Sequence, residues 1–157
     1  MIPPIEFFVP GVPKTAGSKK AFPIWRGKGP SKQFVRSVIV DDAGQAGKDW
    51  RASVQYEAVR RFKEVLGREA APFQGPLAVE FVFNVTRPKG HTGRKGLHSW
   101  APAFPTTKPD VLKLARAVED ALTGIVWKDD AQIVAEVLRK RYSDNPGCLI
   151  HVREVAP

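Results

Sequence analysis

The clearest pattern in the chain is an alternation of apolar and polar positions over residues 77–85. Leu77, Val79, Phe81 and Phe83 fall on one face of an extended segment. Because successive side chains of a strand point to opposite faces, this pattern predicts a half-buried strand. Shorter apolar segments bounded by turn residues predict four more strands, at 5–9, 34–40, 133–142 and 148–152.

The last two of these strands are separated by a dense turn signal, Ser-Asp-Asn-Pro-Gly, at residues 143–147. This signal indicates that residues 148–152 return as a hairpin partner of residues 133–142. The Ala and Leu residues of 133–142 leave a helix open as an alternative for that segment.

Two other segments have the helical period. In residues 45–66, Trp50, Val54, Ala58 and Phe62 recur every three or four positions, and Gly67 is a stop signal. A second helix is expected over residues 110–122, where the apolar positions form one stripe closed by a glycine: Val111, Leu114, Ala115, Val118, Leu122 and Gly124.

The order of these elements, β, β, α, β, α, β, β, predicts an α+β fold with a small mixed sheet and two main helices. We expect one domain over residues 1–157, which suits the length of the chain. Two long segments rich in Gly and Pro, at about 11–33 and 87–109, are expected to be loops. Loops of this length in a small domain are usually functional.

Composition excludes several classes of protein. Hydrophobic residues make up 43% of the chain, too many for a disordered one, and a single cysteine, Cys148, excludes an intramolecular disulfide framework. No apolar run is long enough to cross a bilayer, and the start at Met1 lacks the features of a signal peptide. We therefore expect an intracellular, cytoplasmic protein with no membrane partner and no small-molecule cofactor.

The positive charge is concentrated in two segments. The chain has a formal net charge of +9. Residues 1–40 contain seven cations and one acid, and residues 87–108 contain five cations and no acid. Aromatic side chains are interleaved with these cations: Phe22, Trp25, Trp100 and Phe104. Cations beside aromatic faces suit a phosphate backbone with partly unstacked bases, although two solvated loops would have the same composition.

Carboxylates follow the second basic segment directly. The candidates are Asp110, Glu119, Asp120, Asp129 and Asp130. Carboxylates that hold one or two Mg²⁺ ions can activate water and neutralise a phosphodiester, so the pattern is consistent with a nuclease. Taken alone, Asp110 could simply be an acid at a helix start, and the acidic pair could simply be a turn.

These residues resemble a known family. Residues 108–124 (KPDVLKLARAVEDALTG) and 125–134 (IVWKDDAQIV) are similar to the signature of the RusA family of Holliday-junction resolvases, which runs Lys-Pro-Asp-x-Asp-Asn-Leu-x-Lys, then Asp-Ala-Leu-x-Gly, then Asp-Asp-x-Gln-Val. The resemblance extends, in the family's order, to residues 8–13, 75–83, 87–88 and 140–142.

The resemblance implies a small homodimeric crossover junction endodeoxyribonuclease, encoded by a cell or a phage, that nicks four-way DNA junctions in pairs with Mg²⁺ or Mn²⁺. By position, Asp110 matches the first metal-binding aspartate, and Asp130 with Asp129 matches the later acidic pair. Arg116 falls where the family usually has a lysine that contacts DNA or assists the transition state. Phosphate contacts are expected from the basic segments: Lys14, Lys19, Lys20, Arg87, Lys89, Arg94, Lys95, Lys108 and Lys113.

One departure from the signature leaves two interpretations open. The family's second aspartate falls on Leu112, and the following asparagine falls on Lys113. Either Asp110, Asp129 and Asp130 still assemble a metal site, which we favour, or the chain binds junctions without cutting them. A third hypothesis is a basic module that binds single-stranded nucleic acid through Trp25, Trp100 and Phe104.

Overall fold

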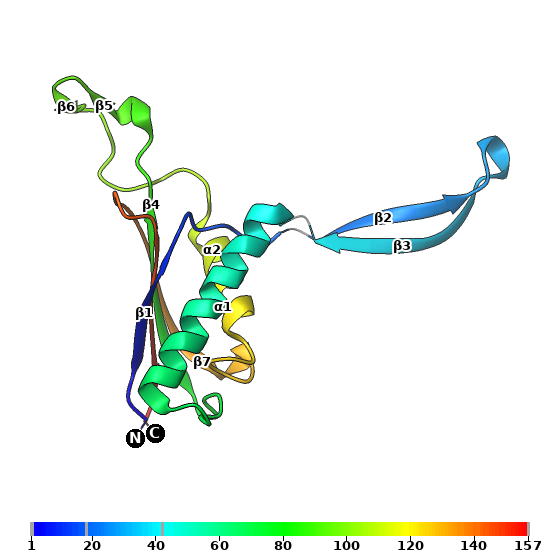
Figure 1. Cartoon of the computed structure of the whole chain (residues 1–157). Coiled ribbons are helices and arrows are strands. Elements are labelled where there is room, and N and C mark those ends of the chain that lie inside the picture. The colour runs from blue at the N-terminus through cyan, green and yellow to red at the C-terminus, as the bar shows by residue number, and fades with distance from the viewer. Residues whose placement is uncertain (1, 18, 42, 157) are drawn as a thin grey trace.

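The structure consists of a four-stranded sheet covered on one face by two helices, with two extensions at one end (Figure 1). This computed structural model describes residues 2–17, 19–41 and 43–156, and only the backbone of residues 19, 40 and 41. The elements are β1 (Ile5–Pro10), β2 (Lys19–Arg26), β3 (Gln33–Asp41), α1 (Gly44–Leu66), β4 (Leu77–Val85), β5 (Thr92–Gly93), β6 (Gly96–Leu97), α2 (Val111–Leu122), β7 (Ile133–Tyr142) and β8 (Gly147–Glu154).

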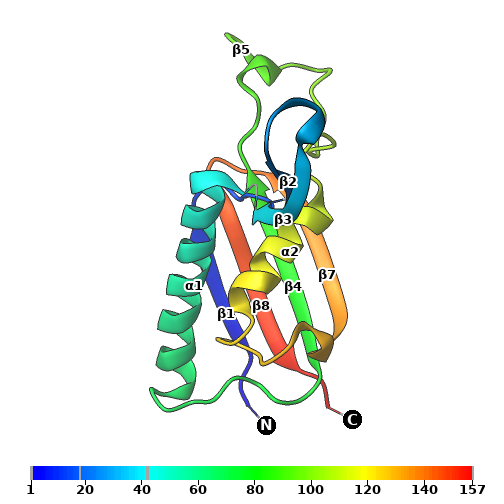
Figure 2. The same cartoon turned by 90° about the vertical axis from the view of Figure 1, so that its right-hand side faces the viewer.

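The main sheet has the order β1-β8-β4-β7, with β8 antiparallel to both neighbours and β7 parallel to β4. Both helices lie on the same face, α1 beside β1 and α2 in front of β4 and β7 (Figure 2). The expected α+β fold with a small mixed sheet and two main helices is confirmed. Among the described residues, no helix is long and apolar enough to cross a membrane.

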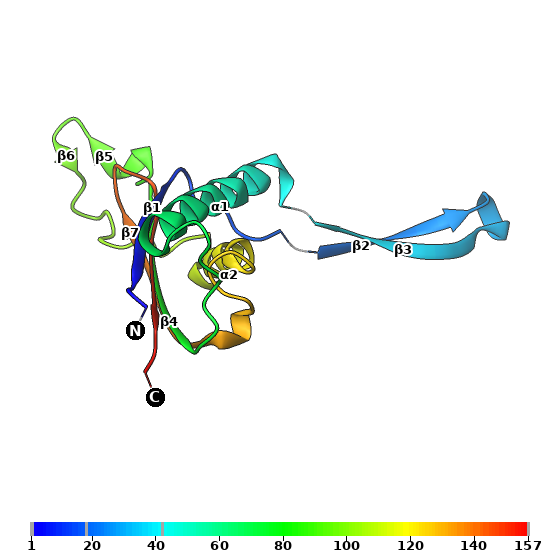
Figure 3. The ribbon, with the colours of Figure 1, turned by 60° about the horizontal axis from the view of Figure 1, so that its bottom comes forward.

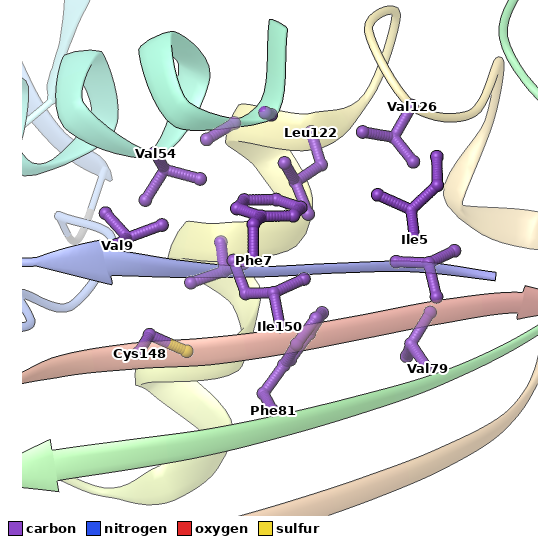
Figure 4. Close-up of a cluster of buried hydrophobic side chains, with 14 of the residues drawn as sticks. Ile5, Phe7, Val9, Val54, Val79, Phe81, Leu122, Val126, Cys148 and Ile150 are labelled. Carbon is purple, nitrogen blue, oxygen red and sulfur yellow. The ribbon is translucent and has the colours of Figure 1, made fainter. Parts of the chain in front are cut away.

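The hydrophobic core fills the space between the sheet and the helices (Figure 4). Phe7 of β1, Phe81 of β4 and Ile150 of β8 meet Val54 of α1 and Leu122 of α2 there. The helices bury most of the stripes that their periodicity predicts, because those positions face the sheet. In α2, Ala121 is buried as well, and Val111 is only partly covered. Each large apolar side chain buried in this way contributes about 1.5–3 kcal/mol.

The expected pairing of the last two strands is wrong. The chain passes from β7 across β4, so that β8 pairs with β1 and β4 and makes no hairpin with β7. Burial on both faces fits this order: Arg153 is the one exposed residue of β8, as suits a central strand, whereas exposed residues alternate with buried ones in the edge strand β1. Most residues of β7 are exposed, so β7 suits the edge.

The first long loop is also different from the expectation. Residues 19–26 form β2, which pairs antiparallel with β3 to make a two-stranded arm that projects from the body of the molecule (Figures 1 and 3). Neither face of the arm packs on the core, so its sequence lacks the alternation that marks a half-buried strand. Ser18, in the same segment, lies outside the described residues.

The second long loop extends from the end of β4 and carries the short β5–β6 pair near its tip (Figure 1). The arm and this loop leave the body at the same end, opposite the chain termini (Figures 1 and 2). Both basic segments therefore lie at one end of the molecule.

Candidate functional site

Asp110 lies at the N-terminus of α2, in the wall of a cavity of about 460 Å³. The lining residues come from the segment after β1 and from the start of α2: Val12, Pro13, Lys14, Thr15, Lys108, Pro109, Asp110 and Lys113. Lys140 of β7 holds the segment that precedes α2. Its Nζ donates hydrogen bonds to the carbonyl oxygens of Thr107, at 2.7 Å, and Pro109, at 2.9 Å.

The charges of this cavity suit a phosphate group. The carboxylate of Asp110 makes no capping hydrogen bond and is 3.7 Å from the Nζ of Lys113. Three lysines, Lys14, Lys108 and Lys113, line the same space, and the free N–H groups at a helix N-terminus also attract anions. An anion held here lies within reach of a carboxylate that can orient a water molecule.

Asp130 lies at the other end of α2, in the short 3₁₀ helix Asp130–Gln132. Its Oδ1 accepts hydrogen bonds from the hydroxyl of Thr123, the C-cap residue of α2, and from the indole Nε1 of Trp127, at 2.9 Å. Trp127 is fully buried, so its ring is part of the core, as expected, and fixes the orientation of Asp130.

Asp129 has a structural role in the turn before β7. It caps the 3₁₀ helix by accepting from the backbone N–H of Ala131, at 2.8 Å. The side chain of Gln132 completes the capping box by accepting from the N–H of Asp129 and donating to the carbonyl oxygen of Phe73, both at 2.9 Å. Of the acidic pair, Asp130 is thus the residue that faces α2.

The expected gathering of Asp110, Asp129 and Asp130 round one ion does not occur within one chain. α2 has 12 residues and is therefore about 18 Å long, and Asp110 and Asp130 lie at its opposite ends. No group of three or more Asp, Glu, His or Cys side chains in the described part of the chain is placed to hold a metal ion. These three residues of a single chain do not fit the divalent metal that the resemblance implies.

A second group of carboxylates surrounds Glu119 near the C-terminal end of α2. Burial raises the pKa of Glu119 to about 8, with further contributions from a hydrogen bond with Glu136 and from the negative charges of Glu136, Asp130 and Asp120. Sequence reasoning missed Glu136. The sequence marks Glu136 only by its place in the strand. It shares a face of β7 with Leu138 and Lys140, whose side chains are partly covered.

Arg116 and Leu112 lie on the outer face of α2. Arg116 is exposed, and 68% of Leu112 is accessible to solvent. Neither side chain lines the cavity beside Asp110. The position of the family's second aspartate is therefore occupied by an exposed apolar side chain, that of Leu112.

The other expected DNA contacts are distributed over the two extensions. Lys89, Arg94 and Lys95 are exposed in the loop that carries β5 and β6. Arg87 is different, because its guanidinium stacks 4.0 Å from the ring of Tyr142 and donates to the carbonyl oxygen of Pro102, at 2.8 Å. Arg87 therefore holds the base of that loop.

The arm carries Lys20, and the side chain of Lys19 lies outside the described part of the structure. It also presents Trp25, whose ring packs edge to face on Phe34, with centroids 5.6 Å apart, and lies 5.3 Å below the Nζ of Lys32. Four further cations of the arm were not among the expected contacts: Arg26, Lys28, Lys32 and Arg36.

Comparison of the sequence with known proteins shows the family to which the chain belongs. Residues 39–153 match the model of the family described as endodeoxyribonuclease RusA. The uncharacterized protein YqaN of Bacillus subtilis is 44% identical over 52 residues, which are 33% of this chain and 37% of YqaN. The family match includes α1, α2 and the whole sheet except β1, and it leaves out β2 and most of β3. The chain belongs to the RusA family of endodeoxyribonucleases.

Proposed function

We propose that this protein cuts branched DNA, with four-way junctions as its preferred substrate and paired nicks as its product. The family is one of Holliday-junction resolvases, which supports the substrate class. The observation that carries the proposal is the position of Asp110, which lines a cavity together with three lysines at the N-terminus of α2.

The cavity supports a defined division of roles. Lys14, Lys108 and Lys113 bind a backbone phosphate and reduce its negative charge, which favours attack by a nucleophile. Asp110 orients the attacking water by accepting its hydrogen bond. Family members use a divalent metal, and we expect Mg²⁺ or Mn²⁺ to be required here, although the described residues of one chain do not assemble its ligands.

The two basic extensions support binding of more than one DNA segment. The arm and the loop that carries β5 and β6 leave the same end of the molecule and diverge (Figure 1). Each carries exposed cations on a backbone that projects from the body of the molecule (Figure 1). A branched molecule presents several duplex arms to such a surface, whereas a single duplex contacts only part of it.

The replacement of the second aspartate by Leu112 favours one alternative, a protein that binds junctions without cutting them. The test is nicking of a mobile four-way junction in Mg²⁺ by the wild type, Asp110→Asn and Leu112→Asp. We expect the wild type to nick, and Asp110→Asn to bind normally but to nick at least 100-fold more slowly. A wild type that binds and never nicks, together with cleavage gained by Leu112→Asp, would contradict the proposal.

The exposed aromatic rings favour a second alternative, a module for single strands. Solvent reaches 47% of Trp25, 65% of Trp100 and 68% of Phe104, so bases could stack on them. Competition binding separates the two functions. We expect a four-way junction to displace a labelled single strand of equal length at a lower concentration than the converse; equal or reversed potency would favour the single-strand module.

A further inference from the structure

The two-stranded arm, formed by β2 and β3, exposes apolar side chains on both of its faces. Phe22 and Ile24 share one face because they lie two residues apart in β2, and Trp25 lies on the other face with Ile39 of the paired strand. Six large apolar side chains of the arm are exposed: Phe22, Ile24, Trp25, Phe34, Val35 and Ile39. A partner with a flat surface covers only one face of a ribbon, whereas the two walls of a groove cover both. The pattern therefore indicates a partner that has a groove.

The charge of the arm favours a polyanion. Residues 20–40 contain five cations and no acid. Three of these cations, Arg26, Lys28 and Lys32, lie at the far end of the arm, beside the short 3₁₀ helix Gly29–Ser31 (Figure 1). Duplex DNA offers a groove with a row of phosphates along each wall, so it matches both the charge and the two exposed faces.

The composition of the arm favours the minor groove over the major groove. Sequence readout in the major groove uses amide and carboxylate side chains as well as cations, and residues 20–40 contain one amide, Gln33, and no carboxylate. Proteins that enter the minor groove combine cations with apolar side chains that wedge between base pairs. The arm has this second combination.

The far end of the arm presents an aromatic pair that can act as such a wedge. Trp25 pairs with Phe34 across the ribbon, and their rings meet edge to face with centroids 5.6 Å apart. The Nζ of Lys32 lies 5.3 Å from the ring of Trp25. The register of the two strands shifts between Ile24 and Trp25, and such an irregularity increases the local twist and changes the direction of the side chains beyond it. The two rings are thus held together beside a cation that attracts phosphate.

We propose that the arm is a second DNA-binding site, which enters the minor groove of one duplex leg of the junction, inserts Trp25 and Phe34 between base pairs and bends the leg. β2 is about 23 Å long, which equals about seven base pairs along DNA. Because Val12 and Thr15, just before the arm, line the cavity beside Asp110, the inserted rings lie about seven base pairs from the phosphate in that cavity. The inference rests on the proposed function for the identity of the leg, but none of its tests requires cleavage.

The first test follows the fluorescence of Trp25 and leaves the arm intact. The chain has four tryptophans, of which Trp50 and Trp127 are 4% and 0% exposed. In the Trp100→Phe protein, Trp25 is therefore the indole that DNA can reach. A linear duplex should quench this fluorescence. Distamycin, which occupies the minor groove, should reverse the quenching, and methyl green, which occupies the major groove, should not. No quenching, reversal by methyl green alone, or stronger quenching by a single strand would overturn the proposal.

The second test measures the shape of the DNA. Energy transfer between dyes at the two ends of a short linear duplex should report a bend of about 20–90° with the wild type. Trp25→Ala combined with Phe34→Ala should abolish the bend and weaken duplex binding about 10-fold, because two stacking contacts are lost. The matched control, Trp100→Ala combined with Phe104→Ala, removes two exposed rings of the other extension and should leave the bend and the affinity unchanged.

The third test locates the insertion in a four-way junction. 2-Aminopurine brightens when its base is unstacked, so we expect the wild type to brighten this probe in one leg at about seven base pairs from the branch. Equal effects of the two double variants on the bend, or a probe that brightens only at the branch, would overturn the inference and leave the nuclease function intact. A wild type that bends DNA but never nicks a junction would instead refute the nuclease function alone.

Discussion

Glu119 shows how one half-buried carboxyl can link stability to pH. Its pKa is raised to about 8, chiefly by burial. In the unfolded chain the group ionises near its ordinary value of 4.5, so the folded state binds more protons between these limits. The stability of the single chain should therefore fall as pH rises from about 4.5 to 8 and stay level above that.

The variant Glu119→Gln removes this dependence. At pH 8 we expect it to be more stable than the wild type by about 1–2 kcal/mol, after allowance for solvent screening of a half-exposed group, and equally stable at pH 4. Urea unfolding at concentrations that keep the chain monomeric measures the difference. Glu64→Gln, on the exposed face of α1, is the control and should show no such trend; a parallel pH profile for the two variants would contradict the assignment.

Gly147 begins β8 where the chain passes close to β1. A Cβ at this position would overlap the carbonyl oxygen of Val9 and the ring of Phe8. We expect Gly147→Ala to destabilise the fold by about 2 kcal/mol or more, because backbone and a packed ring cannot move aside cheaply. Thermal denaturation tests this, with Gly90→Ala as a matched control, since no atom lies within 4 Å of a Cβ there. Equal melting temperatures for the two variants would be inconsistent with this packing.

At the residue scale, the sequence predicts where α2 begins and ends, but not which side chains from other elements lie beside those ends. Asp110 could be assigned to a helix start, and Trp127 to the core, from local pattern alone. The separation of Asp110 and Asp130 is implicit in the sequence, because a helix over the residues that follow Asp110 places the two aspartates at its opposite ends. Glu136 could not, because it depends on which strand lies beside α2.

At the element scale, the periodicity of apolar residues predicted where helices and strands begin and end. It did not predict which strands pair with each other. α1, β4 and β7 begin and end within one residue of their expected positions. The partners of β8 were missed because the turn at residues 143–147 signals only a change of direction, whereas the pairing of β8 with β1 and β4 depends on segments far away in the chain. The second strand of the arm was expected at residues 34–40, and β3 confirms it. The first strand, β2, was missed because a ribbon that packs on nothing needs no polar and apolar side.

We predict that the cations of the two-stranded arm contact DNA. An isolated two-stranded ribbon is marginally stable, so its exposed apolar residues and cations indicate a surface that is completed by a ligand. Changing Lys28, Lys32 and Arg36 to Ser should weaken junction binding and reduce the slope of log K against log salt by up to about 3. The matched control changes Lys63, Arg68 and Lys128, near the opposite end of the molecule, and should leave the slope unaltered; equal effects of the two triple variants would exclude a special role for the arm.

At the scale of the whole molecule, the two basic segments project away from the hydrophobic core. The sheet and the two helices bury the apolar positions, while both basic extensions leave the body at one end (Figures 1 and 3). With a net charge of +9, the protein should bind DNA with a steep dependence on salt. Sequence analysis identified the basic segments and the family, but the direction in which the segments project depends on the assembled sheet.

The most direct test of the central claim, that this chain cuts branched DNA, is cleavage of a supercoiled plasmid that extrudes a cruciform. We expect linear product in Mg²⁺ from paired nicks at the base of the cruciform, no product in EDTA, and no cutting of the same plasmid after relaxation. Asp130→Asn should abolish the product without loss of binding. Binding of the cruciform with no strand cut, or equal cutting of the relaxed plasmid, would contradict the account.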